Sequence, residues 1–97
     1  MAIGRRERFD VIKPRVIQIF GDDPATITHV AQVFELMEMA WHDCYGEVTP
    51  SEQIVDEILL CSHGKLSGLI AAAQTAVVDR RDLHVWAGAL RAQNPQR

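Results

Sequence analysis

Residues 64–76 read GKLSGLIAAAQTA, and the smallest side chains of this stretch recur at every fourth position. The row consists of Gly64, Gly68, Ala72 and Ala76. In a helix, residues four apart lie on the same face, so this row forms a stripe with almost no side-chain bulk. A glycine inside a helix costs about 1 kcal/mol relative to alanine, and we expect the compensating gain to be a close contact with another helix. The partner would be either an earlier helix of this chain or the same stripe in a second copy.

The stripe has a simpler explanation as well. Gly64 could end a helix, because glycine is favoured just beyond a helix C-terminus, and the alanines of residues 71–73 could reflect helix-forming composition alone. The sequence therefore leaves open whether one helix runs on through Gly64 and through the polar residues near Asp79. Apolar residues keep helical spacing past both positions, and an unbroken element would be about 40 Å long.

The residues before the stripe predict a long amphipathic helix. Apolar side chains recur at steps of three and four over residues 27–41, which is the pattern of a helix with one buried face. Asp22 or Asp23 can cap the start of this helix, with Pro24 in its first turn. Gly46 is its natural C-terminal stop.

Two further helix starts can be read from the sequence. Residues 49–52, Thr-Pro-Ser-Glu, form a capping box in which the first and last residues satisfy each other's backbone amides. Residues 5–20 also have helical periodicity, and Pro14 either kinks a helix there or begins one. A short strand over residues 15–20 is the alternative, but the sequence offers no second strand to pair with it.

Length and composition point to one all-α domain. The chain has 97 residues, of which 47% are hydrophobic and only 6% aromatic. This length supports a single core, and this composition suits packed helices better than sheets. We predict three to four helices over residues 1–97 that form a small bundle or helical hairpin completed by dimerisation, with residues 1–5 and 94–97 frayed.

Charged residues are unevenly distributed along the chain. Residues 1–15 contain five Lys or Arg and two acids, residues 16–64 contain nine acids and no Lys or Arg, and residues 79–97 contain four Arg and two Asp. The basic ends could fold back beside the acidic middle, within one chain or across a dimer. The alternative is nucleic-acid binding, through the N-terminal arm or through a helix-turn-helix over residues 57–74. Neither segment provides a strongly basic face, so we expect no nucleic-acid partner.

The segments WHDCYG and CSHG supply the residues with the greatest chemical potential, His42, Cys44, Cys61 and His63. Two His and two Cys are a zinc ligand set, but helical residues two apart point about 200° away from each other, so only a turn at both places would let them share an ion. A Cys–His nucleophile pair needs a tertiary contact that the sequence does not show, and a Cys within a helix is ordinarily a small apolar residue. We therefore predict neither a metal ion nor a cofactor.

No motif in the sequence predicts catalysis, since phosphate-binding loops, nucleophile elbows and dinucleotide fingerprints are absent from it. There is no secretory signal, and the longest uncharged stretch, residues 66–78, is too short to cross a bilayer, so we expect a cytoplasmic protein with reduced cysteines. The prediction is a helical protein–protein interaction or structural module, homodimeric and without an activity of its own. The alternative is a protein that binds a metal or a small ligand through the two His–Cys motifs.

Overall fold

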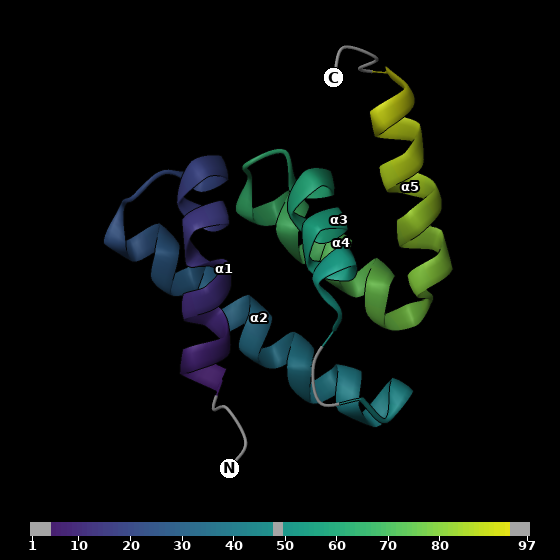
Figure 1. Cartoon of the computed structure of the whole chain (residues 1–97), viewed down its shortest axis with the longest axis horizontal. Coiled ribbons are helices and arrows are strands. Elements are labelled where there is room, and N and C mark those ends of the chain that lie inside the picture. Colours follow the sequence, from purple (N-terminus) through teal and green to yellow (C-terminus); the bar gives the residue numbers. More distant parts are fainter. Residues whose placement is uncertain (1–4, 48–49, 94–97) are drawn as a thin grey trace.

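The structure, a computed structural model, describes residues 5–47 and 50–93, and nearly all of these residues are helical (Figure 1). The all-α prediction is confirmed, but this part of the chain forms five helices, not three or four. In chain order they are α1 (Arg5–Phe20), α2 (Pro24–Tyr45), α3 (Glu52–Ser62), α4 (Leu66–Val78) and α5 (Arg80–Gln93).

Two breaks in the C-terminal half account for the additional helices. His63 and Gly64 follow α3 with φ angles of 54° and 71°, in the left-handed region that cannot continue a right-handed helix. Gly64 also lies against the end of α1, where a Cβ atom would be 2.8 Å from the carbonyl oxygen of Ile19. Asp79 follows α4 in an extended conformation with a φ angle of −159°. A single unbroken element of about 40 Å is therefore excluded.

Both ends of α2 agree with the sequence prediction. The Asp23 carboxylate accepts a hydrogen bond from the backbone N–H of Thr26 at 3.0 Å, and Pro24 occupies the first helical position. Gly46 ends the helix with a φ angle of 71°, and its N–H donates to the carbonyl oxygen of His42 at 2.9 Å. These caps are local interactions, which is why the sequence alone was sufficient to predict them.

The predicted helical segment over residues 5–20 is confirmed, and the predicted start of the next helix after α2 needs correction. α1 is continuous through Pro14, so no helix begins there, and residues 15–20 are helical and not a strand. α3 begins two residues later than predicted, because the hydroxyl of Ser51 accepts from the backbone N–H of Ile54 at 3.3 Å and caps the helix. The predicted cap, Thr49, lies outside the described residues. Serine caps a helix at least as well as threonine does.

The core of the molecule is built around α4. This helix packs against α2, α3 and α5, while α3 also contacts α5 and α1 packs on α2. In Figure 1, α1 and α5 lie at opposite ends of the molecule, with α3 and α4 between them. Four helices each contribute a fully buried large side chain, and burial of each contributes about 1.5–3 kcal/mol. These side chains are Trp41, Ile58, Leu69 and Leu83.

The row of small residues lies inside this core. Ala72 and Ala76 are fully buried. Gly68 is so close to the C-terminal end of α3 that a Cβ atom there would lie 2.3 Å from the carbonyl oxygen of Ser62. The close contact is thus between α4 and helices of the same chain, and the buried positions are closed to a second copy. Gly64 belongs to the turn before α4 and not to the helical row.

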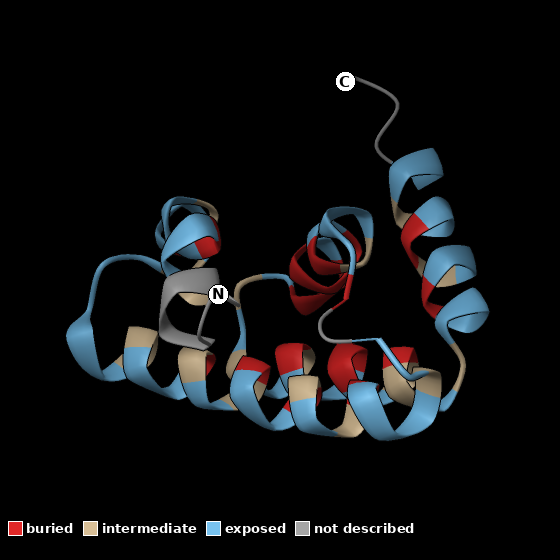
Figure 2. Cartoon of the chain, turned by 60° about the horizontal axis from the view of Figure 1, so that its bottom comes forward, coloured by how far each residue is buried: buried red, intermediate tan, exposed pale blue. Residues whose placement is uncertain are grey.

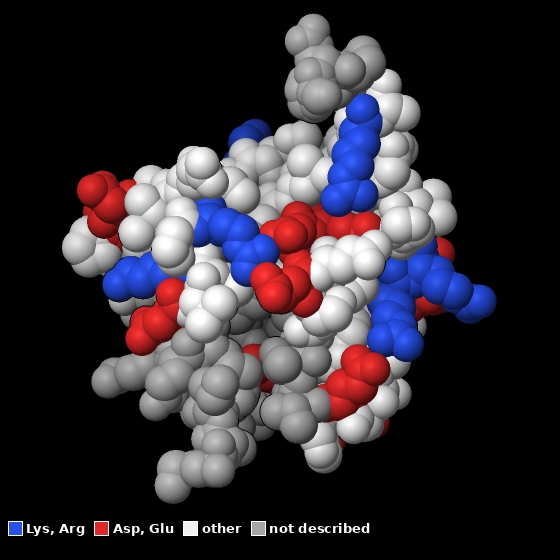
Figure 3. All heavy atoms as spheres, viewed as in Figure 1, with Lys and Arg blue, Asp and Glu red and all other residues white. Residues whose placement is uncertain are grey.

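The unevenly distributed charges pair within the molecule. Figure 3 shows acidic side chains near the middle of one face with basic side chains on either side of them. Basic residues from α1 and α5 therefore do fold back beside the acidic middle of the chain, although each exposed pair contributes at most about 1 kcal/mol. The exposed pairs are Arg15 with Glu52 and Asp56, and Arg80 with Glu47. Arg91 also pairs with Glu57, whose carboxylate is buried.

Candidate functional sites on α2, α3 and α5

The structure does not bring the two His–Cys motifs together into a ligand set. His42 and Cys44 are exposed near the C-terminal end of α2, and His63 is exposed in the turn after α3. Cys61 is buried within α3. Among residues 5–47 and 50–93, no group of three or more His, Cys, Asp or Glu side chains is placed so that it could hold a metal ion.

The thiol of Cys61 is poorly suited to nucleophilic chemistry. Burial and, to a smaller extent, the nearby Glu57 carboxylate raise the pKa of the Cys61 thiol to about 11, and Arg91 partly opposes them. Because the thiolate is the reactive form, Cys61 is an inert apolar side chain at neutral pH.

The two cysteines should therefore differ sharply in reactivity. At pH 8 we expect a colorimetric disulfide reagent to modify one thiol rapidly, the exposed Cys44, and to modify Cys61 only after the protein is unfolded in denaturant. The Cys44→Ser variant is the control, since it should lose the fast reaction and keep the slow one. Two rapidly reacting thiols in the folded protein would contradict the burial of Cys61.

A buried carboxylate lies between α3 and α5. Glu57 of α3 is fully buried. Its Oε2 atom is 2.7 Å from Nδ1 of His84 and 3.6 Å from a terminal nitrogen of Arg91, both on α5. Its Oε1 atom is also buried and has no hydrogen-bond partner. The side chains of His84 and Arg91 are themselves more than half exposed.

Two basic side chains at the surface, those of His84 and Arg91, contact the one buried carboxylate of Glu57. A carboxylate that accepts from Nδ1–H of an imidazole fixes the tautomer and leaves Nε2 for another partner, as in acid–base sites. Covalent catalysis would also need an activated nucleophile. The thiol coupled to this cluster, Cys61, has its pKa shifted in the wrong direction for that role. The cluster is therefore better explained as a polar contact that joins α3 to α5 than as a catalytic site.

Sequence reasoning did not single out this cluster. Glu57 and His84 are 27 residues apart, and no local pattern links them. One signal was available: Glu57 precedes Cys61 by four residues, so the two share the face of α3 that turned out to be buried. An acid on a buried helix face requires a partner from elsewhere in the fold.

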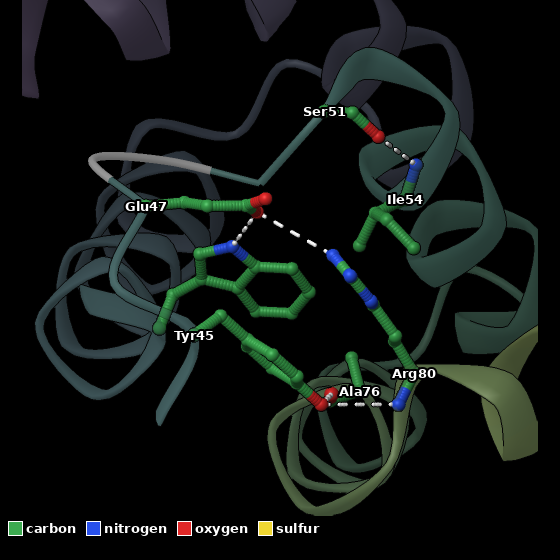
Figure 4. A network of polar contacts seen from close by, with 7 residues as sticks. Tyr45, Glu47, Ser51, Ile54, Ala76 and Arg80 are labelled. Atoms are coloured by element: carbon green, nitrogen blue, oxygen red, sulfur yellow. Dashed lines mark hydrogen bonds and ion pairs between the residues drawn. The ribbon is translucent and has the colours of Figure 1, made fainter. Parts of the chain in front are cut away.

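A second polar network joins the end of α2 to the junction between α4 and α5 (Figure 4). The hydroxyl of Tyr45 donates to the carbonyl oxygen of Ala76 at 2.8 Å and accepts from the backbone N–H of Arg80 at 3.1 Å. The Arg80 guanidinium lies 4.8 Å from the centre of the Tyr45 ring and 3.5 Å from a Glu47 oxygen. The same oxygen accepts from the indole N–H of Trp41 at 2.9 Å. The network satisfies the polar ends of two packed aromatic side chains, so its role is structural.

Removal of the Tyr45 hydroxyl should weaken this junction measurably. We expect Tyr45→Phe to lower the free energy of unfolding by about 1–2 kcal/mol, because two hydrogen bonds are lost while the ring and its contact with Arg80 remain. Urea unfolding followed by circular dichroism measures the change. Arg80→Gln is the control: it retains the backbone N–H and removes only the exposed guanidinium, so its effect should be smaller. A neutral Tyr45→Phe variant would show that the hydroxyl makes no net contribution.

α3, the following turn and α4 have the order of a helix-turn-helix, but α4 does not present a nucleic-acid-binding surface. The helix lies at the centre of the molecule, against three others. Its outward positions carry no positive charge, whereas a recognition helix needs side chains that reach phosphates and base edges. These exposed residues are Ser67, Ile70, Ala71, Gln74 and Val78.

The outer side of α2 is exposed along most of the helix. Figure 2 shows α2 along the base of the molecule, with its outer side exposed over most of its length and the other helices on its inner side. Leu36 and Met39 lie three residues apart on this outer side and are 66% and 51% exposed. Neighbouring exposed apolar side chains can form part of a contact surface.

Comparison of the chain with protein-family models, with curated proteins and with solved structures gives no significant match. In the described residues, no helix combines the length and the apolar character needed to cross a membrane. The arguments for function therefore depend on the chain's own geometry.

Proposed function

We propose that the chain is a helical interaction module that functions as a homodimer and performs no chemistry of its own. The observation that supports this best is the outer side of α2, where Leu36 and Met39 are exposed in mid-helix. Removal of apolar surface from water stabilises a contact by about 25 cal/mol per Å². Two copies of the pair would bury four such side chains.

A second copy is the partner that we favour. Small oligomers are mostly two-fold dimers in which the same patch is used by both subunits, and an apolar patch is complementary to itself. α2 contains no Lys or Arg, so its outer side has no permanent positive charge that would call for an acidic partner. The small-residue stripe does not support dimerisation, because its helical positions are filled by the chain's own packing.

The proposal can be tested by sedimentation velocity. We expect a reversible monomer–dimer equilibrium between roughly 5 and 100 μM, since a contact of one helix face is small and association is opposed by the loss of translational and rotational freedom. A protein that stays monomeric across that range would contradict the proposal.

Substitution on the outer side of α2 identifies the surface involved. Leu36→Glu should weaken dimerisation at least about tenfold, because each subunit then buries a carboxylate in place of an apolar side chain. Val85→Glu is the matched control: Val85 is 70% exposed on α5, so the same change there should leave the equilibrium unaltered. Circular dichroism should show the same helix content for both variants. Equal weakening by both would assign the effect to net charge and not to the surface of α2.

A further inference from the structure

We infer that α5 is a detachable cover over α3 and α4. In the open state α5 separates from both helices and loses its helical structure as one unit, while α1 to α4 stay packed. The buried charge of Glu57, which lies beneath α5, sets how often the cover opens. This opening is independent of the proposed homodimer.

α5 lies at one edge of the core. It contacts α3 and α4, whereas α4 also packs against α2 and α3, and α1 packs on α2. Of the four large buried side chains named above, only Leu83 belongs to α5. The extended backbone at Asp79 separates α5 from the end of α4. The contacts among the first four helices therefore do not depend on α5.

α5 has little helical stability of its own. It has 14 residues, and isolated helices shorter than about 12–15 residues are marginal in water. Gly88 lowers its helix propensity further, and no neighbouring atom within 4 Å requires a glycine there. Once detached, α5 should lose its helical hydrogen bonds, so its opening can be followed as exchange of its backbone amides with solvent.

The polar contact beneath α5 is incompletely satisfied. The Glu57 carboxylate contacts α5 at His84 and at Arg91, which are about two turns apart. A buried ion is well compensated only when its remaining lone pairs have partners. Here Oε1 has none, and Arg91 lies 3.6 Å from Oε2, beyond hydrogen-bond range. α4, which also packs on α3, has no charged side chain to supply the missing contact.

Opening hydrates the carboxylate while its partners lose little. The side chains of His84 and Arg91 are already 62% and 52% exposed, whereas that of Glu57 is fully buried. This contact therefore opposes opening less than an apolar contact of the same area would. The buried side chains of Leu83 and Ala87 keep the closed state dominant.

Amide hydrogen exchange tests the opening. It is followed by mass spectrometry of overlapping fragments, at a protein concentration below the range of the proposed dimer. The amides of residues 84–90 should exchange at a common rate, at least about tenfold faster than the slowest amides of α2 and α4. Rates equal to those of α2 and α4 would overturn the inference. Rates that rise steadily toward Gln93 would also overturn it, because they indicate fraying of a helix end.

Val16→Ala tests whether α5 opens separately from the whole fold. Val16 is fully buried on α1, which lies at the opposite end of the molecule from α5 (Figure 1). The lost methyl groups should speed exchange of the slowest α2 and α4 amides about tenfold through global unfolding. Exchange in α5 should stay within about twofold, because the closed and open states lose the same contact. Equal acceleration everywhere would show that α5 opens only when the whole protein unfolds.

Glu57→Met tests the role of the buried charge. It should slow exchange in α5 at least about threefold, because the closed state then buries no ion. Asp56→Met is the matched control: Asp56 is the neighbouring acid of α3, is half-exposed and pairs with Arg15 of α1. The same change there should leave exchange in α5 within about twofold. Unchanged or faster exchange in Glu57→Met, or equal slowing in both variants, would overturn the role of Glu57.

Discussion

Gly68→Ala should lower the free energy of unfolding by about 2 kcal/mol or more, because the added Cβ atom collides with backbone that cannot move aside. The atom would lie 2.3 Å from the carbonyl oxygen of Ser62 and 3.0 Å from its carbonyl carbon. Relief of this contact requires α4 to move away from the end of α3. That movement would open the core at Ala72, which is fully buried on the same face of α4.

Gly88 provides the matched control on a neighbouring helix. It lies within α5, is exposed, and has no atom within 4 Å of the position of an added Cβ. Gly88→Ala should therefore raise the free energy of unfolding by about 1 kcal/mol through helix propensity alone. Urea unfolding of both variants measures the two opposite effects. If Gly68→Ala were as stable as the parent protein, the close contact between α3 and α4 would be wrong.

Removal of His84 should destabilise the protein more than removal of the buried carboxylate with which it pairs. We expect His84→Ala to cost about 2–3 kcal/mol, because it leaves the fully buried Glu57 with only Arg91, at 3.6 Å, as a partner. Glu57→Met should lie within about 1 kcal/mol of the parent or be more stable. The reason is that His84 and Arg91 are more than half exposed, so water solvates them once the carboxylate is gone.

The double variant tests whether both effects come from the same pair. Once Glu57 is replaced by methionine, His84→Ala should cost little further, because the imidazole then has no buried charge to compensate. Thermal and urea unfolding of the two single variants and the double variant complete the cycle. Additive effects would show that His84 stabilises the fold by some contact other than the one with Glu57.

Local signals predicted the helix ends well where a cap consists of neighbouring residues. Asp23 and Gly46 bound α2 as expected, since each acts on backbone groups within one turn of its own position. The start of α3 lies two residues later than predicted because Ser51, which also carries a hydroxyl group, caps the helix. The number of helices was underestimated because the apolar periodicity continues through Gly64 and Asp79. The backbone at both positions nevertheless departs from the helical conformation.

The row of small residues was recognised for the right physical reason, but its partner was not specified. Periodicity places Gly68, Ala72 and Ala76 on one face, and missing bulk implies close approach. Which surface approaches depends on how α4 is oriented against α2 and α3, and that orientation is a property of the assembled core. The outer side of α2 became a candidate surface only when the fold showed which of its faces is left uncovered.

By itself, the sequence determined that this protein is helical and where its longest helix begins and ends. It also determined which face of the segment that forms α4 carries only small side chains. These properties depend on interactions within one or two turns. The tertiary structure alone decided that the stripe is closed within the chain, that Glu57 is buried against residues of α5, and that Leu36 and Met39 stay exposed. Burial depends on contacts between helices distant in the chain, and a one-dimensional pattern specifies a helix face without specifying what covers it.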